Sequence, residues 1–148
     1  MPITYLPIGS DGIALSADGE HLFFGAVGSR YLYSVPTERL RDKSEVSEVL
    51  AQAAVVSRGQ KGVSDGYETD SNNLIYFGNM EQNAVSYYNP ANGTTGIFVR
   101  DPRVNWVDTC KFCLAPSMPR QARLQSSDSI QSSPLQCRGD EYPADQRA

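Results

Sequence analysis

Three aspartates stand where they could hold a cation. The tripeptide Ser-Asp-Gly occurs at 10–12 and again at 64–66, so Asp11 and Asp65 are 54 residues apart, and Asp108 follows later in the chain. Carboxylates that face one another repel unless a cation lies between them, and their hard oxygen atoms suit calcium. If the fold brings these positions together, Asp11, Asp65 and Asp108 are candidate calcium ligands, and Asp11 and Asp65 are also candidate contacts for a small-molecule ligand.

The same aspartates have a simpler interpretation. Aspartate before glycine is common in turns, because the carboxylate accepts hydrogen bonds from the backbone amides of its own loop. Both interpretations stay open on the sequence alone.

A second polar group lies in the loop at 78–83, which contains Asn79, Glu81 and Asn83. Successive turns of an antiparallel meander alternate between the two ends of the sheet, which places this loop at the same end as Asp65. Asn79, Glu81 and Asn83 are therefore further candidates for ligand binding. The alternative is an ordinary solvated turn.

Other catalytic chemistry finds little support. Cys110 and Cys113 have the spacing of a zinc-binding pair, but Cys137 is the one remaining cysteine and His21 the one histidine, whereas a structural zinc site needs four ligands. The sequence has no second histidine for a catalytic triad. These features favour a protein that is not an enzyme.

Charge and hydropathy restrict the partners. The formal net charge of −4 removes the general attraction that nucleic acid or an anionic membrane surface requires. No stretch approaches the roughly 18 apolar residues of a membrane-spanning helix, and the first ten residues do not resemble a secretion signal. Asn92 begins the glycosylation motif Asn-Gly-Thr in a predicted turn, which suits an extracellular protein. We expect a small-molecule ligand, with neither nucleic acid nor membrane as a partner.

The candidate residues belong to a repeated unit. Segments 10–36 and 64–90 share the order Ser-Asp-Gly, strand, turn, aromatic strand ending in Phe-Gly, and a further strand, with Phe24-Gly25 and Phe77-Gly78 53 residues apart. The strands are short, rich in aromatic and β-branched residues, and separated by Asp, Gly and Asn. Such a meander is typical of a β-propeller blade, which buries both faces only between neighbouring blades.

The rest of the chain divides around these copies. Apolar residues at helical spacing in 44–54 predict one short inserted helix capped by Ser44, and 55–57 and 94–99 are predicted outer strands. We therefore predict an all-β fold: a partial β-propeller over residues 1–109, with blades at about 9–62 and 63–105 and the start of a third at 106–109.

The composition changes after Thr109. Residues 110–148 are rich in Ser, Gln, Pro, Arg and Asp and follow neither a strand nor a helix period. Too little apolar surface is present to offset the entropy of ordering, so we predict a disordered C-terminal tail unrelated to the repeat. The change also suggests a truncated or mis-spliced version of a longer protein.

The segments at 11–19, 31–37, 64–66 and 101–109 lie in order over most of residues 9–109. They resemble the major royal jelly protein and yellow family. The resemblance implies a secreted, six-bladed propeller, of which this chain holds about two blades. It also implies binding of small ligands such as biogenic amines, or roles in pigmentation and nutrition, mostly without a settled enzymatic activity.

Three functions remain open. The first is ligand binding without catalysis at the mouth of a central channel. The second is metal-dependent hydrolysis of a sugar lactone, because the aspartate positions also resemble metal-ligand positions of the gluconolactonase superfamily. The third is an inactive truncated product, since missing blades leave sheet edges and apolar faces exposed.

Overall fold

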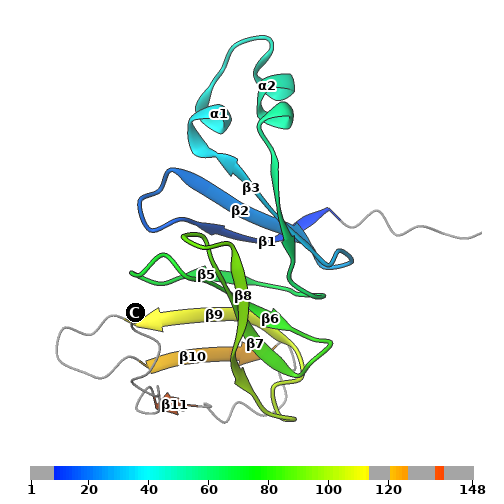
Figure 1. The fold of residues 1–148 in the computed structure, drawn as a ribbon, viewed down its shortest axis with the longest axis vertical. Helices are drawn as coiled ribbons and strands as arrows, with labels where there is room; N and C mark the ends of the chain where they lie inside the picture. Colours follow the sequence, from blue (N-terminus) through cyan, green and yellow to red (C-terminus); the bar gives the residue numbers. More distant parts are fainter. Residues whose placement is uncertain (1–8, 114–120, 127–135, 139–148) are drawn as a thin grey trace, which may run out of the picture.

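The computed structural model describes residues 9–113, 121–126 and 136–138, whose strands form three antiparallel sheets lying one above another (Figure 1). The first sheet has its strands in chain order: β1 (Ser10–Leu15), β2 (His21–Ala26), β3 (Tyr31–Pro36) and β4 (Val56–Gln60). The second follows the same order: β5 (Tyr67–Thr69), β6 (Ile75–Asn79), β7 (Ala84–Asn89) and β8 (Thr94–Arg100). The prediction of two four-stranded meanders is confirmed.

Equivalent turns join the first two strands of each sheet. In the first, the Asp18 carboxylate accepts a hydrogen bond from the Glu20 amide (2.9 Å). In the second, the Asp70 carboxylate accepts one from the Asn72 amide (2.8 Å), and Asn73 takes the left-handed conformation with φ of 66°. Asp and Asn favour these turns because their short side chains hydrogen-bond to nearby backbone amides.

The insertion between β3 and β4 holds two helices where one was predicted: α1 (Thr37–Arg41) and α2 (Ser47–Ala53). The backbone amide and hydroxyl of Ser44 bind the Asp42 carboxylate (2.9 and 3.0 Å), so Ser44 belongs to the connection between the helices instead of capping α2. The first helix follows β3 directly, and the Thr37 hydroxyl at its start donates to the Gly19 carbonyl (2.8 Å).

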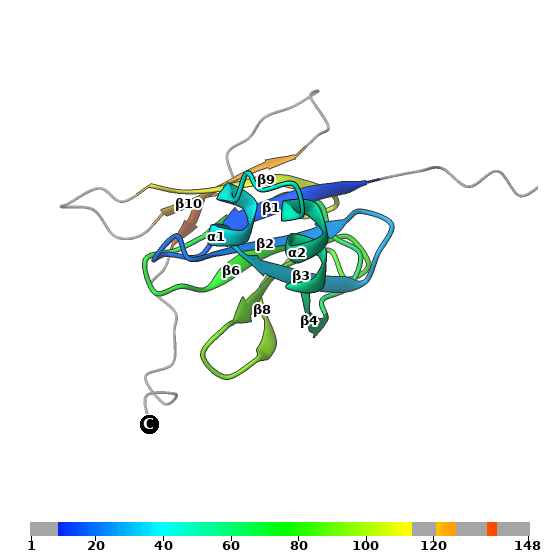
Figure 2. The ribbon, with the colours of Figure 1, turned by 90° about the horizontal axis from the view of Figure 1, so that it is seen from above.

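Both helices lie over the first sheet, away from the other two (Figures 1 and 2). The predicted apolar spacing is present in α2, but none of its residues is buried, and Val49 is 67% exposed. No helix in the described part of the chain is long and apolar enough to cross a membrane.

The innermost strands of the three sheets are neighbours, because β5 contacts β1 on one side and β9 (Val107–Cys113) on the other. Between the first two sheets, Phe23 and Leu32 pack with Tyr67 and Phe77 in one buried cluster. A second cluster, which includes Tyr76, joins the second sheet to the third. Face-to-face stacking around neighbouring inner strands is the arrangement of propeller blades.

The repeated Phe-Gly dipeptide lets the next sheet approach closely. Tyr67, the first residue of β5, lies on Gly25, and a Cβ atom there would be 2.5 Å from the Tyr67 hydroxyl oxygen. Val107, the first residue of the third sheet, lies on Gly78, but with its backbone. Glycine at these two positions therefore permits the contact between successive blades.

The third sheet includes part of the segment predicted to be disordered. Its strands lie in the order β11 (Gln136–Arg138), β10 (Gln121–Ser126) and β9 (Val107–Cys113). Strand β10 pairs with β9, which packs against β5 and β6, and β11 pairs with β10. Composition does not reveal such pairing. The rest of the predicted tail lies outside the described residues.

Candidate functional site

Two loops that carry predicted site residues lie together at one end of the sheets. The linker between β4 and β5 runs beside the β6–β7 turn, where the Met80 amide donates to the Val63 carbonyl (3.1 Å). The Val63 amide donates in turn to the Glu81 carboxylate (3.0 Å). The predicted location of this turn, at the same end as the second Ser-Asp-Gly, is therefore correct, while ligand binding by its residues stays a prediction.

The aspartate group, Asp11, Asp65 and Asp108, gathers at this end, where the innermost strands begin. Asp65 is only 8% exposed, and its carboxylate accepts hydrogen bonds from the Trp106 indole (2.7 Å) and the Gly66 amide (3.0 Å). The pKa of the Asp11 carboxyl is raised, first by the charge of Asp65, then by burial, by a hydrogen bond with Asp65 and by the charge of Asp108. The three carboxylates thus share one region.

The aspartate group does not amount to a metal site as it stands. Within the described ranges, no three or more His, Cys, Asp or Glu side chains are placed to hold a metal ion. Calcium binding therefore remains a prediction.

The third sheet approaches the second through a different contact from the one that joins the first two. Val107 lies against Gly78 with its backbone carbonyl, whereas Tyr67 lies against Gly25 with its side-chain hydroxyl. Trp106, which binds Asp65, was not predicted, because the partner of an indole N–H is fixed only by folding.

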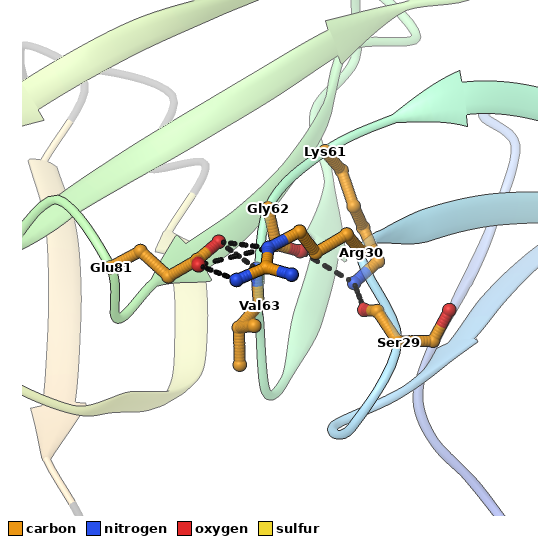
Figure 3. A network of polar contacts seen from close by, with 6 residues as sticks. All are labelled: Ser29, Arg30, Lys61, Gly62, Val63 and Glu81. Atoms are coloured by element: carbon orange, nitrogen blue, oxygen red, sulfur yellow. Dashed lines mark hydrogen bonds and ion pairs between the residues drawn. The ribbon is translucent and has the colours of Figure 1, made fainter.

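A separate pocket of about 360 Å³ lies between the first and second sheets at the same end. We call it the interblade pocket; its polar lining includes Arg30, Lys61, Asn79, Glu81, Gln82 and Ser86. Arg30 and Glu81 form an ion pair across the two sheets, with Arg30 Nε 2.9 Å from Glu81 Oε1 (Figure 3). Asn79 and Glu81 thus belong to this pocket and not to the aspartate group.

Lys61 is the charged residue that the sequence did not reveal. It is 3% exposed, and its ammonium donates to the backbone carbonyls of Ser29 and Gly62, each at 3.0 Å (Figure 3). Burial lowers the pKa of Lys61 to about 8, and the negative charge of Glu81 opposes that shift. A single lysine in a polar linker has no sequence signature, because carbonyls from two loops create its site.

The side-chain amide of Asn79 is buried, but only its nitrogen has a hydrogen-bond partner among the described residues. The side chain is 5% exposed, and its Nδ2 donates to Ser86 Oγ (3.3 Å). Its Oδ1 has no hydrogen-bond partner among the described residues. Buried polar atoms without partners are rare in folded proteins, which marks this oxygen as a candidate contact for a ligand.

The remaining predicted residues lie outside both groups. Asn83 takes a left-handed conformation with φ of 49°, and its carbonyl accepts a hydrogen bond from the Asp101 amide (3.1 Å), so it shapes the turn. Asn92 lies exposed in the β7–β8 turn, and its side-chain oxygen accepts hydrogen bonds from the amide and hydroxyl of Thr94 (3.1 and 2.7 Å).

The fold and the meeting of inner strands define a β-propeller, here represented by two complete four-stranded blades and a third sheet. The sequence model of the family described as "Major royal jelly protein" matches residues 4–110. The chain belongs to the major royal jelly protein family, as the sequence resemblance indicated. No curated protein is significantly similar to the chain in sequence.

Solved structures share the fold at low identity. A calcium-binding protein, regucalcin, from Agrobacterium tumefaciens aligns with a TM-score of 0.58 and 19% identity, over 84% of this chain and 40% of its own. A gluconolactonase from Xanthomonas campestris has a TM-score of 0.53 and 15% identity, over 79% of this chain and 34% of its own. An auxiliary nutrient binding protein from Bacteroides thetaiotaomicron has a TM-score of 0.54 and 13% identity, over 82% of this chain and 27% of its own. The chain spans less than half the length of each.

Proposed function

We propose that this chain is part of an extracellular propeller that binds a small, positively charged ligand at the mouth of its central channel, without transforming it. The observation that carries the proposal is the gathering of the aspartate group where the innermost strands begin, so that the charges of Asp65 and Asp108 raise the pKa of Asp11. Carboxylates that repel one another are relieved by a cation between them. An ammonium ligand also agrees with the amines that the family resemblance implies.

Binding without catalysis is supported by the residues near the aspartate group. His21, the one histidine of the chain, lies on β2 beside the β1–β2 turn, where its backbone amide donates to Ser16 Oγ (2.9 Å). That turn is at the other end of the blade from Asp11, since successive turns of a meander alternate ends. The aspartate group therefore lacks a neighbouring histidine to serve as a general base.

Calorimetric titration of the 148-residue chain with tyramine, and with 4-ethylphenol as its analogue without the amine, tests the proposal. We expect tyramine to bind, 4-ethylphenol not to bind, and Asp11→Asn to weaken tyramine binding by about tenfold. Asp11 is exposed, so this substitution should leave the fold intact. Asp18→Asn, in the turn at the other end, is the matched control. Tyramine binding that Asp11→Asn leaves unchanged would contradict the proposal.

Metal-dependent lactone hydrolysis is the second candidate, favoured by the same carboxylates and by the likeness to a calcium-binding protein of the same fold. As placed, the described side chains do not form a metal site, so no hydrolytic step follows from them. Titration with calcium, with and without Asp65→Ala, separates the candidates. Calcium binding that requires Asp65 would favour the hydrolase and weigh against the amine.

The extracellular location has its own test. Asn92 is exposed in a turn and carries the glycosylation motif, so expression through a eukaryotic secretory pathway should yield a chain whose mass falls on treatment with an N-glycosidase. Asn92→Gln should remove that change. A secreted chain without glycan on Asn92 would remove this support for the extracellular location.

A further inference from the structure

The interblade pocket is distinct from the aspartate group and differs from it in charge. The residues that line it come from the first two blades, both of which lie within the described residues. Of the described residues that line it, Ile97 is the one large apolar side chain. Its volume of about 360 Å³ falls within the size of small-molecule sites, about 300–1,000 Å³. A pocket with this lining suits a small polar ligand.

The charges of the pocket favour an anion. Arg30 and Glu81 neutralise each other, because the guanidinium contacts both oxygens of the carboxylate (Nε to Oε1 2.9 Å, Nε to Oε2 3.1 Å). Within the described residues the ammonium of Lys61 forms no ion pair, and its hydrogen bonds go to the backbone carbonyls of Ser29 and Gly62. An ammonium has three N–H donors, which leaves one for a ligand.

One buried polar atom of a residue that lines the pocket lacks a hydrogen-bond donor. Asn79 Oδ1 accepts no hydrogen bond from any described residue, although Asn79 is only 5% exposed. The amide nitrogen of the same side chain is held by Ser86 Oγ, which fixes the orientation of the amide. A ligand hydroxyl would supply the missing donor.

We propose that the interblade pocket binds a small hydroxylated carboxylate, with a ligand hydroxyl donating to Asn79 Oδ1 and the ligand carboxylate accepting from Lys61. Lys61 and Asn79 both line this pocket, and Gly62, which follows Lys61 in the chain, lies against the Asn79 side chain. A ligand with neighbouring hydroxyl and carboxylate groups can therefore meet both. This site uses neither Asp11 nor Asp65 and is independent of the amine site proposed above.

The protonation of Lys61 agrees with an anionic ligand. Its pKa of about 8 keeps the ammonium largely charged at neutral pH. The groups that face it are the carboxylate of Glu81 and the ring of Tyr67, whose centroid is 5.7 Å from Nζ. An anion bound beside Nζ would raise the pKa of Lys61 further.

Three four-carbon probes separate the parts of the proposal: threonate, threitol and butyrate. Threonate carries hydroxyls and a carboxylate, threitol carries hydroxyls alone, and butyrate carries a carboxylate alone. Calorimetric titration of the 148-residue chain at pH 7 should show threonate binding at least about tenfold more tightly than either other probe. No threonate binding, or butyrate binding equal to it, would overturn the proposal.

Asn79→Leu tests the role of the unused oxygen. We expect threonate binding to weaken by about tenfold or more, with an unchanged or raised melting temperature, because a buried polar atom without a partner is replaced by an apolar one. Asn72→Leu makes the same change in an exposed turn and should leave binding intact. Threonate binding by Asn79→Leu equal to that of the unaltered chain would contradict the assignment.

Labelling of the unaltered chain decides the matter if Asn79→Leu fails to fold. Acetic anhydride should acetylate Lys61 more slowly when threonate is present, while labelling of the exposed Lys43 stays constant. Mass spectrometry of the peptides measures both rates. Equal labelling of Lys61 with and without threonate would overturn the proposal.

Discussion

The first and second blades are copies of one unit, yet they are buried to different extents. All five residues of β6 are buried, because sheets pack against both faces of the second blade. In β2, by contrast, Phe23 and Gly25 are the buried residues, and the opposite face is only partly covered. Ile13 of the first blade is 56% exposed, whereas Tyr67, its equivalent in the second, is 8% exposed. Burial in this fold is therefore set by neighbouring blades and not by the repeat alone.

The difference extends to the junctions. Lys61 and Asp101 are equivalent, since their amides donate to the carbonyls of Arg30 (2.8 Å) and Asn83 (3.1 Å), which are 53 residues apart. Lys61 is enclosed between two blades, while Asp101 is paired with Arg103 near the surface (2.7 Å). The same backbone position thus forms a pocket in one junction and a surface ion pair in the other.

Replacing Phe77 of the second blade, and its equivalent Phe24 of the first, with alanine tests the difference in burial between the blades. This is the largest effect we expect. Phe77 is fully buried between blades, so Phe77→Ala should lower the free energy of unfolding by about 3–5 kcal/mol. Phe24 is only partly buried, so Phe24→Ala should cost about 1 kcal/mol. Urea unfolding of both variants measures the difference. Equal losses would show that the two faces are covered alike.

Alanine at the two docking glycines should give a smaller contrast. At Gly78, a Cβ would overlap the backbone of Val107, which cannot move aside without shifting β9, so we expect a loss of about 3 kcal/mol. At Gly25 the nearest atoms are the ends of the Tyr67 and Lys61 side chains, which can adjust, so we expect about 1–2 kcal/mol.

Gly28→Ala serves as the control for this pair, because nothing lies within 4 Å of the position of its Cβ. Its stability should be close to that of the unaltered chain. A loss at Gly25 as large as that at Gly78 would mean that Tyr67 is held as rigidly as a backbone segment.

The third prediction concerns the alkaline range. Lys61 has a pKa of about 8 in the folded chain and 10.5 ordinarily, so the unfolded chain binds more protons between these values and stability should rise with pH from about 8 to about 10. Burial raises the pKa of Tyr67 from 10.0 to about 12, so stability should fall again above pH 10. Lys61→Met should remove the rise but keep the fall, as measured by urea unfolding at several pH values. A rise that persists in Lys61→Met would refute this origin.

Asp101 should act at the opposite end of the pH scale. Hydrogen bonds from the side chain and backbone of Arg103 lower the pKa of the Asp101 carboxyl to about 2 from the ordinary 3.8. The associated stability is present above pH 4 and is lost as pH falls towards 2. Because the pair is exposed to solvent, the change should be smaller than the one at Lys61.

Much of the fold could be predicted because its signals are local. Alternating aromatic strands around Phe24 and Phe77, and turns at Asp18 and Asp70, are encoded in adjacent residues. The sites were less predictable. Lys61 is enclosed by carbonyls of Ser29 and Gly62, and Asp65 is bound by Trp106 from the next sheet, so each depends on contacts that only the folded chain brings together.

The insertion and the third sheet show the same limit. The apolar spacing of 44–54 located α2, but this helix begins at Ser47, because Ser44 instead forms hydrogen bonds with Asp42. Strands β10 and β11 lie in a segment whose composition predicts disorder, and their order comes from pairing with β9 and with each other. Interactions between segments, not the composition of each segment, decide these regions.

Proton contacts between Tyr67 and the glycines of the first blade test the central claim, that the two repeats pack as adjacent blades. Nuclear Overhauser measurements on the full chain should show the Tyr67 ring close to the α-protons of both Gly12 and Gly25, because the ring lies on both glycines. If the ring instead shows no contact with either glycine while both meanders are formed, the blades do not stack in this way, and the interblade pocket does not exist.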